Sequence, residues 1–174
     1  MSTRSSLCGK KDIRTNKAGI IVGLLALLIF VTVRMFCSNP YEMIHKLDTA
    51  NIIPPLWLFD LLSFVWGFMI GYAAGSVIEC ILHGGASITA EISSYRGGLF
   101  FLTTLFLYQI WHSQFFCEER LILAIAIVGI SLVTCIACSY FWSSVSKLSA
   151  LILGAFGLWL FYLFILNVSV LLHI

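Results

Sequence analysis

Five long apolar runs constrain the fold of this chain more than any other feature of its sequence. Crossing about 30 Å of bilayer hydrocarbon takes roughly 20 mostly apolar residues in an α-helix, which rises about 1.5 Å per residue. Four of the runs contain no Asp, Glu, Lys or Arg, where the second run is taken as residues 61–78. Of these residues, the first run contains only Arg34. They predict transmembrane helices at about residues 18–36, 56–82, 97–116, 121–142 and 148–172.

The composition argues against the other broad fold classes. With 60% hydrophobic and 10% charged residues, the chain lacks the polar surface that a water-soluble domain needs. Strands of a membrane barrel alternate apolar and polar residues, whereas these runs are apolar on every side. The connections at 117–120 and 143–147 are short enough to make the last three helices antiparallel neighbours. We therefore predict an all-α integral membrane protein, a five-transmembrane-helix bundle that has the lipid bilayer as a partner and no nucleic-acid partner.

The basic N-terminal segment bears on topology. Residues 1–17 are polar and basic, and we predict a tail that is attracted to anionic headgroups, ahead of a membrane domain at 18–174. The first apolar run could be a secretory signal, but it is longer than a typical signal core, and residues 34–38 offer no small-x-small cleavage site, so we expect a retained anchor. A cytoplasmic N-terminus puts seven Lys and Arg residues inside and three outside. That bias predicts a C-terminus on the opposite side.

Small residues form a ridge on the second predicted helix. Ser63, Gly67, Gly71 and Gly75 recur at intervals of four and so share one helix face. Small residues let a second helix approach closely, and such contacts drive helix association in lipid. The ridge predicts a helix-packing surface at the three glycines. Its partner could be another helix of the same chain or a second copy in a homodimer.

Aromatic residues cluster on two other predicted helices. Tyr108, Trp111 and Phe115 share a face of the third, and Trp159 lies in the middle of the fifth. Most Trp and Tyr residues in membrane proteins belong to the belt at the membrane–water interface. Trp159 is too deep for that belt, and its indole N–H gains from a partner inside the bundle or on a ligand. These rings are candidates for binding a ligand.

Groups that could perform chemistry are sparse. Cys135 and Cys138 have the spacing of a redox motif, but no His or carboxylate lies near them in the run, so we interpret them as small core residues. Asp60 falls in the first turns of its helix, where free N–H groups favour an anion. His112 is the deepest ionisable residue, and such residues usually face a cavity or a partner. No pattern indicates a catalytic dyad, a triad or a metal site.

Several short motifs, taken in order, resemble one known family. Residues 54–59 read Pro-Pro-Leu-Trp-Leu-Phe, residues 111–116 read Trp-His-Ser-Gln-Phe-Phe, and a mid-helix Trp159 precedes a Leu-Asn pair at 166–167. With residues 41–46 and the five helices, they resemble the TspO/MBR family, the tryptophan-rich sensory or translocator proteins, over about residues 18–174. The chain departs from that pattern, because the family usually has Trp at Ser63, Tyr at Gly67, Gln at Thr104 and Asn at Tyr108. It resembles a divergent member.

The resemblance implies a bundle that binds porphyrins, such as protoporphyrin IX or heme, and needs no cofactor. The residues expected to contact such a ligand are Trp57, Ser63, Trp66, Tyr108, Trp111, Trp159 and Asn167. Trp66, one turn from Ser63, is hypothesised to restore the missing indole. One alternative is a porphyrin-degrading membrane enzyme, although of the two tryptophans implied for that activity only the one at Trp159 is present. The other is a small transporter or an assembly subunit that docks through the glycine ridge.

Overall fold

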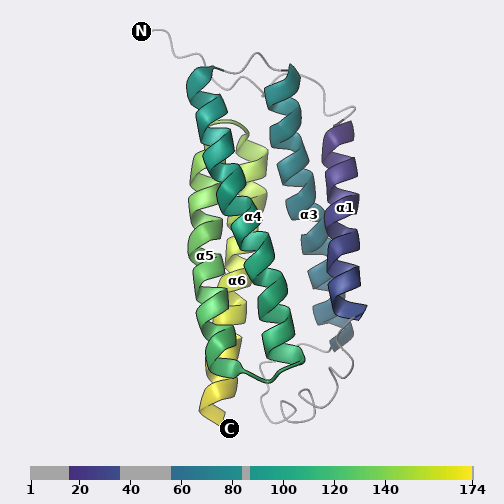
Figure 1. The fold of residues 1–174 in the computed structure, drawn as a ribbon, viewed down its shortest axis with the longest axis vertical. Helices are drawn as coiled ribbons and strands as arrows, with labels where there is room; N and C mark the ends of the chain where they lie inside the picture. The colour runs from purple at the N-terminus through teal and green to yellow at the C-terminus, as the bar shows by residue number, and fades with distance from the viewer. Residues whose placement is uncertain (1–15, 36–55, 84–86, 174) are drawn as a thin grey trace.

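The computed structural model describes residues 16–35, 56–83 and 87–173, and the regular structure in these ranges is helical. The helices are α1 (Lys17–Met35), α3 (Leu56–His83), α4 (Ile88–Phe116), α5 (Leu121–Ser143) and α6 (Lys147–His173). They run side by side along one long axis, and each is antiparallel to the one before it (Figure 1). The all-α class predicted from the apolar runs is confirmed.

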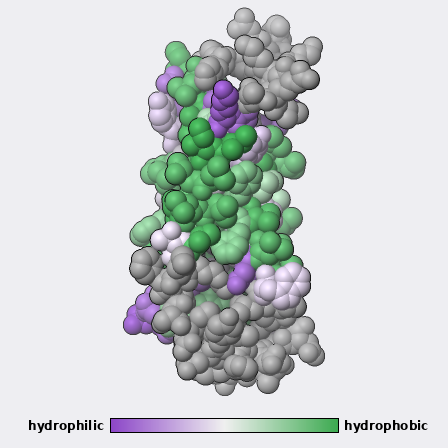
Figure 2. All heavy atoms as spheres, turned by 90° about the vertical axis from the view of Figure 1, so that its right-hand side faces the viewer, coloured by the Kyte–Doolittle hydropathy of each residue, from purple (hydrophilic) through white to green (hydrophobic). Residues whose placement is uncertain are grey.

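The helices have the length and hydropathy of membrane spans to different degrees. Among the described residues, Trp57–Leu82, Leu121–Ser143 and Lys147–Leu172 are long and apolar enough to cross a membrane, and α1 has a shorter apolar stretch at Lys17–Val33. On the face toward α1, apolar side chains cover the middle, and hydrophilic ones lie toward the two ends (Figure 2). This distribution is the one that a bilayer requires.

Helix α4 begins nine residues before the position expected from hydrophobicity. The hydrophobic run starts at Gly97, whereas the helix starts at Ile88. The Ser87 side chain accepts a hydrogen bond from the Ala90 N–H at 3.3 Å and so satisfies one of the free donors of the first turn. Glu91 in that turn interacts favourably with the helix dipole. The other four helices begin and end within one residue of their predicted ranges.

The bundle consists of two groups of helices. Helix α1 packs along α3, and α4, α5 and α6 pack in succession. The two groups meet mainly where α3 packs against α6. The backbone of α4 comes close to the backbones of α1 and α3 at only a few positions (Figure 1). Large side chains therefore fill the space between α4 and the first group.

The glycine ridge faces α1. A Cβ added at Gly75 would overlap the Ala18 carbonyl oxygen and lie 2.5 Å from the Gly19 Cα, and one added at Gly71 would lie 2.6 Å from the Ala26 Cβ. No real Cβ makes such contacts, so only glycine permits this approach of the two helices. The ridge is buried within the chain.

Polar contacts hold the start of α1 against the end of α3. The Asn16 side chain donates a hydrogen bond to the Ser76 hydroxyl. The Ala18 N–H, one of the free donors at the start of α1, donates to the Glu79 carboxylate at 3.2 Å. Together with the glycine ridge, these contacts make α1 and α3 a closely packed pair.

Candidate ligand-binding site

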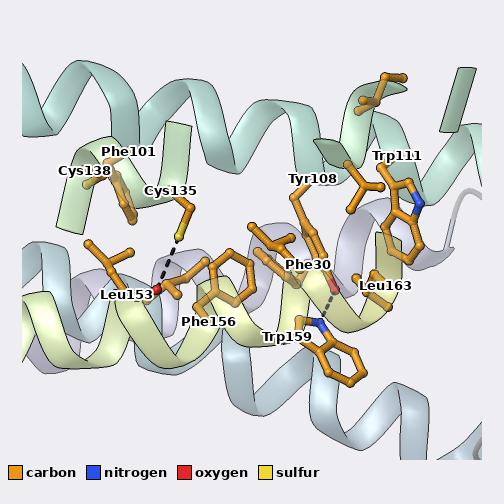
Figure 3. Packing of buried hydrophobic residues seen from close by; sticks show 14 of the residues in the cluster. Phe30, Phe101, Tyr108, Trp111, Cys135, Cys138, Leu153, Phe156, Trp159 and Leu163 are labelled. Atoms are coloured by element: carbon orange, nitrogen blue, oxygen red, sulfur yellow. Dashed lines mark hydrogen bonds between the residues drawn. The ribbon is translucent and has the colours of Figure 1, made fainter. Parts of the chain in front are cut away.

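Aromatic rings fill the space between α3, α4 and α6. Tyr108 and Trp111 of α4 are almost completely buried, and Trp159 of α6 is 9% exposed. The Phe30 ring of α1 stacks on Tyr108 with centroids 5.3 Å apart. Figure 3 shows these four residues gathered at one level of the bundle. Tyr108 and Trp111 reach the same space because residues three apart share a helix face.

A chain of hydrogen bonds crosses this cluster from α6 to α3. The Trp159 Nε1–H donates to the Tyr108 hydroxyl at 3.4 Å, and the Tyr108 hydroxyl donates to the Ser63 Oγ at 3.5 Å. The Ser63 hydroxyl donates in turn to the Phe59 carbonyl at 2.9 Å. The first two distances are near the upper limit for a hydrogen bond, so these two bonds are weak.

A second and tighter network fixes Trp111. Its Nε1–H donates to the Asn167 Oδ1 at 3.2 Å. The Asn167 Nδ2–H₂ donates to the Leu163 carbonyl at 2.6 Å, and the Asn167 side chain is fully buried. The oxygen and the nitrogen of the Asn167 carboxamide both form hydrogen bonds, so the side chain is fixed and holds the Trp111 indole in one orientation.

The structure brings most of the residues expected at the site together. Ser63, Tyr108 and Trp159 are joined by the first network, and Trp111 and Asn167 by the second. The remaining expected residues lie at the edge of this cluster or away from it.

Trp66 lies at the edge of the cluster, and Trp57 lies apart from it. The Trp66 ring is 5.7 Å from that of Phe156, which is 5.5 Å from Tyr108. The Trp57 side chain is 67% exposed on the outside of α3. Gly67, Gly71 and Gly75 face α1 and contribute no side chain to the site.

Phe59 and Phe30 belong to the cluster although neither was among the residues expected to contact a ligand. The Phe59 ring lies 5.4 Å from Trp159 and 6.4 Å from Trp111. Residues two apart in a helix point in nearly opposite directions, so Trp57 and Phe59 cannot both face the cluster, and in the structure it is Phe59 that does. That spacing is a sequence feature that could have shown that only one of the two lines the site. The sequence of α1 carries no comparable indication for Phe30.

Two positions that depart from the family pattern are filled by side chains from other helices. The Tyr108 hydroxyl reaches Ser63, where the pattern has a Trp. The Phe30 ring lies over Gly67, where the pattern has a Tyr, and its Cγ is 3.0 Å from the place of an added Cβ. Side chains of α4 and α1 thus occupy the space that a Trp at position 63 and a Tyr at position 67 of α3 would fill. The smaller residues at positions 63 and 67 therefore do not widen a pocket, because side chains of neighbouring helices lie against them.

The cluster offers ring faces and a few hydrogen-bonding groups. In the described ranges, no group of three His, Cys, Asp or Glu side chains is placed to hold a metal ion. His112 is buried beside Trp111, with its ring 4.8 Å from that of Phe116. Such an arrangement suits a flat apolar molecule that is bound by stacking.

The cysteines of the described helices lie outside the cluster. Cys135 and Cys138 are buried free thiols that donate to the Leu153 and Gly97 carbonyls at 3.3 and 3.2 Å. Cys80 and Cys117, near the C-terminal ends of α3 and α4, are each disulfide-bonded. The C-terminal ends of α3 and α4 lie at opposite ends of the bundle (Figure 1).

Comparison with known proteins identifies the family. A sequence model of the TspO/MBR family matches residues 19–172, which is most of the 174-residue chain and includes every residue of the aromatic cluster. No curated protein and no solved structure matches the chain. The five helices of the described ranges agree with the five-helix membrane bundle of that family. The chain belongs to the TspO/MBR family of multi-pass integral membrane proteins.

Proposed function

We propose that this protein binds porphyrins or similar planar apolar ligands, with protoporphyrin IX and heme as the candidates, between α3, α4 and α6. The observation that carries the proposal is the buried set of large rings, Tyr108, Trp111 and Trp159, at a place where α4 has few other contacts with α3. Sites for such ligands are apolar, lie between helices and contain few polar groups.

The two hydrogen-bond networks suggest how the site would accept a ligand. Trp111 is held by Asn167 and forms a fixed wall. Tyr108 and Trp159 share weaker bonds, and their donors can turn toward ligand oxygens at low cost. Phe30 is stacked on Tyr108, and aromatic pairs contribute about 0.5–1.5 kcal/mol beyond their buried area. A planar ligand that takes the place of Phe30 would restore that contact with its own ring.

Trp66 contributes at the edge of this proposed site. Its indole reaches Tyr108 only through Phe156, so its stacking on a ligand is a secondary contact. It partly replaces the indole that the family pattern has at Ser63.

The arrangement of the chain in the membrane is also a proposal. We infer a cytoplasmic N-terminus and a C-terminus on the opposite side, because seven of the ten Lys and Arg residues then lie inside. A homodimer would use a surface other than the glycine ridge, since Gly71 and Gly75 are buried against α1.

Titration of the purified full-length protein tests the ligand class. Protoporphyrin IX and heme are expected to quench tryptophan fluorescence saturably at about one ligand per chain, because only a discrete site saturates. A sterol, which has no planar aromatic ring to stack on the three rings, is expected to bind more weakly. Equal affinity for the sterol, or quenching that rises without saturation as for partition into the micelle, would exclude a stacking site.

A further inference from the structure

An apolar groove lies on the outer face of α5 and α6, away from the aromatic cluster. It has a volume of about 490 Å³. Gly154 and Gly157 form its floor, and a Cβ added at either would come no closer than 4.0 Å to another atom. Ile136 of α5 and Phe161 of α6 are among the side chains that form its walls, and Tyr140 lies at one end.

The groove opens toward the bilayer. It is formed by two helices that are long and apolar enough to cross a membrane, and its residues Leu158 and Tyr140 are 72% and 75% exposed. Along α5 it extends from Leu132 to Tyr140, which corresponds to about 12 Å of helix rise. One leaflet has about 15 Å of hydrocarbon. Tyr140 lies within a turn of the end of α5 at Ser143, the level at which Tyr side chains meet lipid headgroups.

We propose that this groove binds one acyl chain of a bilayer phospholipid, with the headgroup at the level of Tyr140. The wall and floor are apolar toward the middle of the membrane, and the polar side chains, Ser139 and Tyr140, lie at the interfacial end. The Ser139 hydroxyl already donates to the Ala150 carbonyl at 2.9 Å. The Tyr140 hydroxyl is therefore the donor that faces the ester or phosphate oxygens of the lipid.

A second copy of the chain fits this groove less well than a lipid chain does. A two-fold dimer places the same surface of each subunit against its partner. A two-fold axis through the groove would set one hollow against the other and leave a void, in which the lining side chains lose their dispersion contacts. A single flexible chain fills one hollow completely.

Photolabelling in vesicles tests the proposal with the full-length protein. The vesicles consist of phosphatidylcholine that carries a photoactivatable diazirine in one acyl chain, and the labelled residues are identified by mass spectrometry. Leu158 and Ile136 are expected to be labelled several-fold more than Val133, which is 67% exposed on α5 but does not line the groove. Uniform labelling of all three would overturn the proposal, because it would mean that lipids contact the groove only transiently.

Two variants connect the labelling with the groove. Gly154→Leu fills the floor and is expected to remove the excess labelling of Ile136 and Leu158, and Gly154→Ala is expected to reduce it partly and serves if the larger residue impairs folding. The matched control is Ala155→Leu, at the next position of α6, which is exposed and does not line the groove. Loss of the labelling when a sterol is added, or chemical crosslinks between copies that disappear in Gly154→Leu, would overturn the proposal by showing a different occupant.

Discussion

Gly75→Ala is expected to lower the melting temperature of the protein in detergent by about 5–10 °C, which corresponds to roughly 2–3 kcal/mol for a chain of this size. The added methyl would overlap the Ala18 carbonyl oxygen and lie 2.5 Å from the Gly19 Cα. Both are backbone atoms, so no side chain can turn away to make room, and α1 itself must move. That movement also weakens the contacts of Asn16 with Ser76 and of Ala18 with Glu79.

The matched control for this change is Gly98→Ala in α4. A Cβ at Gly98 has no neighbouring atom within 4 Å, and alanine is the better helix former by about 1 kcal/mol. Gly98→Ala is therefore expected to leave the melting temperature unchanged or raise it slightly. Equal melting temperatures for the two variants would mean that α1 does not lie against the glycine ridge.

Trp159→Leu is expected to weaken the binding of protoporphyrin IX by about ten- to a hundredfold. The substitution removes a stacking surface and the donor to the Tyr108 hydroxyl. Loss of a large buried apolar contact costs about 1.5–3 kcal/mol, and each 1.4 kcal/mol corresponds to about tenfold in the dissociation constant. Fluorescence titration of the detergent-purified variant measures the change.

Trp57→Leu provides the control with the same chemical change. Trp57 lies on the outside of α3 with 67% of its side chain exposed, so its loss is expected to change affinity less than about threefold, or under 0.7 kcal/mol. If Trp57→Leu weakens binding as much as Trp159→Leu does, the ligand lies near the start of α3 and not within the aromatic cluster.

The helices could be predicted from the sequence because a membrane sets their length. Four of them begin and end within one residue of their predicted ranges. The start of α4 differs because hydrophobicity does not report a polar cap, whereas the hydrogen bond between Ser87 and Ala90 extends the helix through Glu91 and Arg96. A search for capping residues ahead of each run would have found it.

The contacts that individual residues make in the folded bundle were harder to predict from the sequence. The glycine ridge indicated a close helix contact but not which helix makes it, because spacing describes only one of the two surfaces. The contact of Tyr108 with Ser63 joins residues 45 positions apart and depends on how two helix groups meet. Phe30 lies in a run that is apolar on every side, so no periodicity distinguishes its buried face from the lipid-facing one.

The burial of the site has a consequence for how a ligand reaches it. The rings contact one another, and Phe30 occupies the face of Tyr108 that a ligand would use. Binding as proposed would therefore exchange one stacked ring for another and would need a rearrangement of α1 side chains. Affinity measured at equilibrium reflects both the gain of ligand contacts and the loss of this stack.

Mapping of photo-oxidation tests whether a porphyrin binds within the cluster of Tyr108, Trp111 and Trp159. In aerated solution, illuminated protoporphyrin IX converts dissolved oxygen to singlet oxygen, which oxidises nearby indoles, and mass spectrometry of the complex at one ligand per chain identifies which tryptophans are modified. Trp159 is expected to be oxidised first, although it is only 9% exposed, and Trp57, at 67% exposed, is expected to be oxidised much later. Oxidation in the order of exposure, with Trp57 first and Trp159 spared, would contradict binding within this cluster.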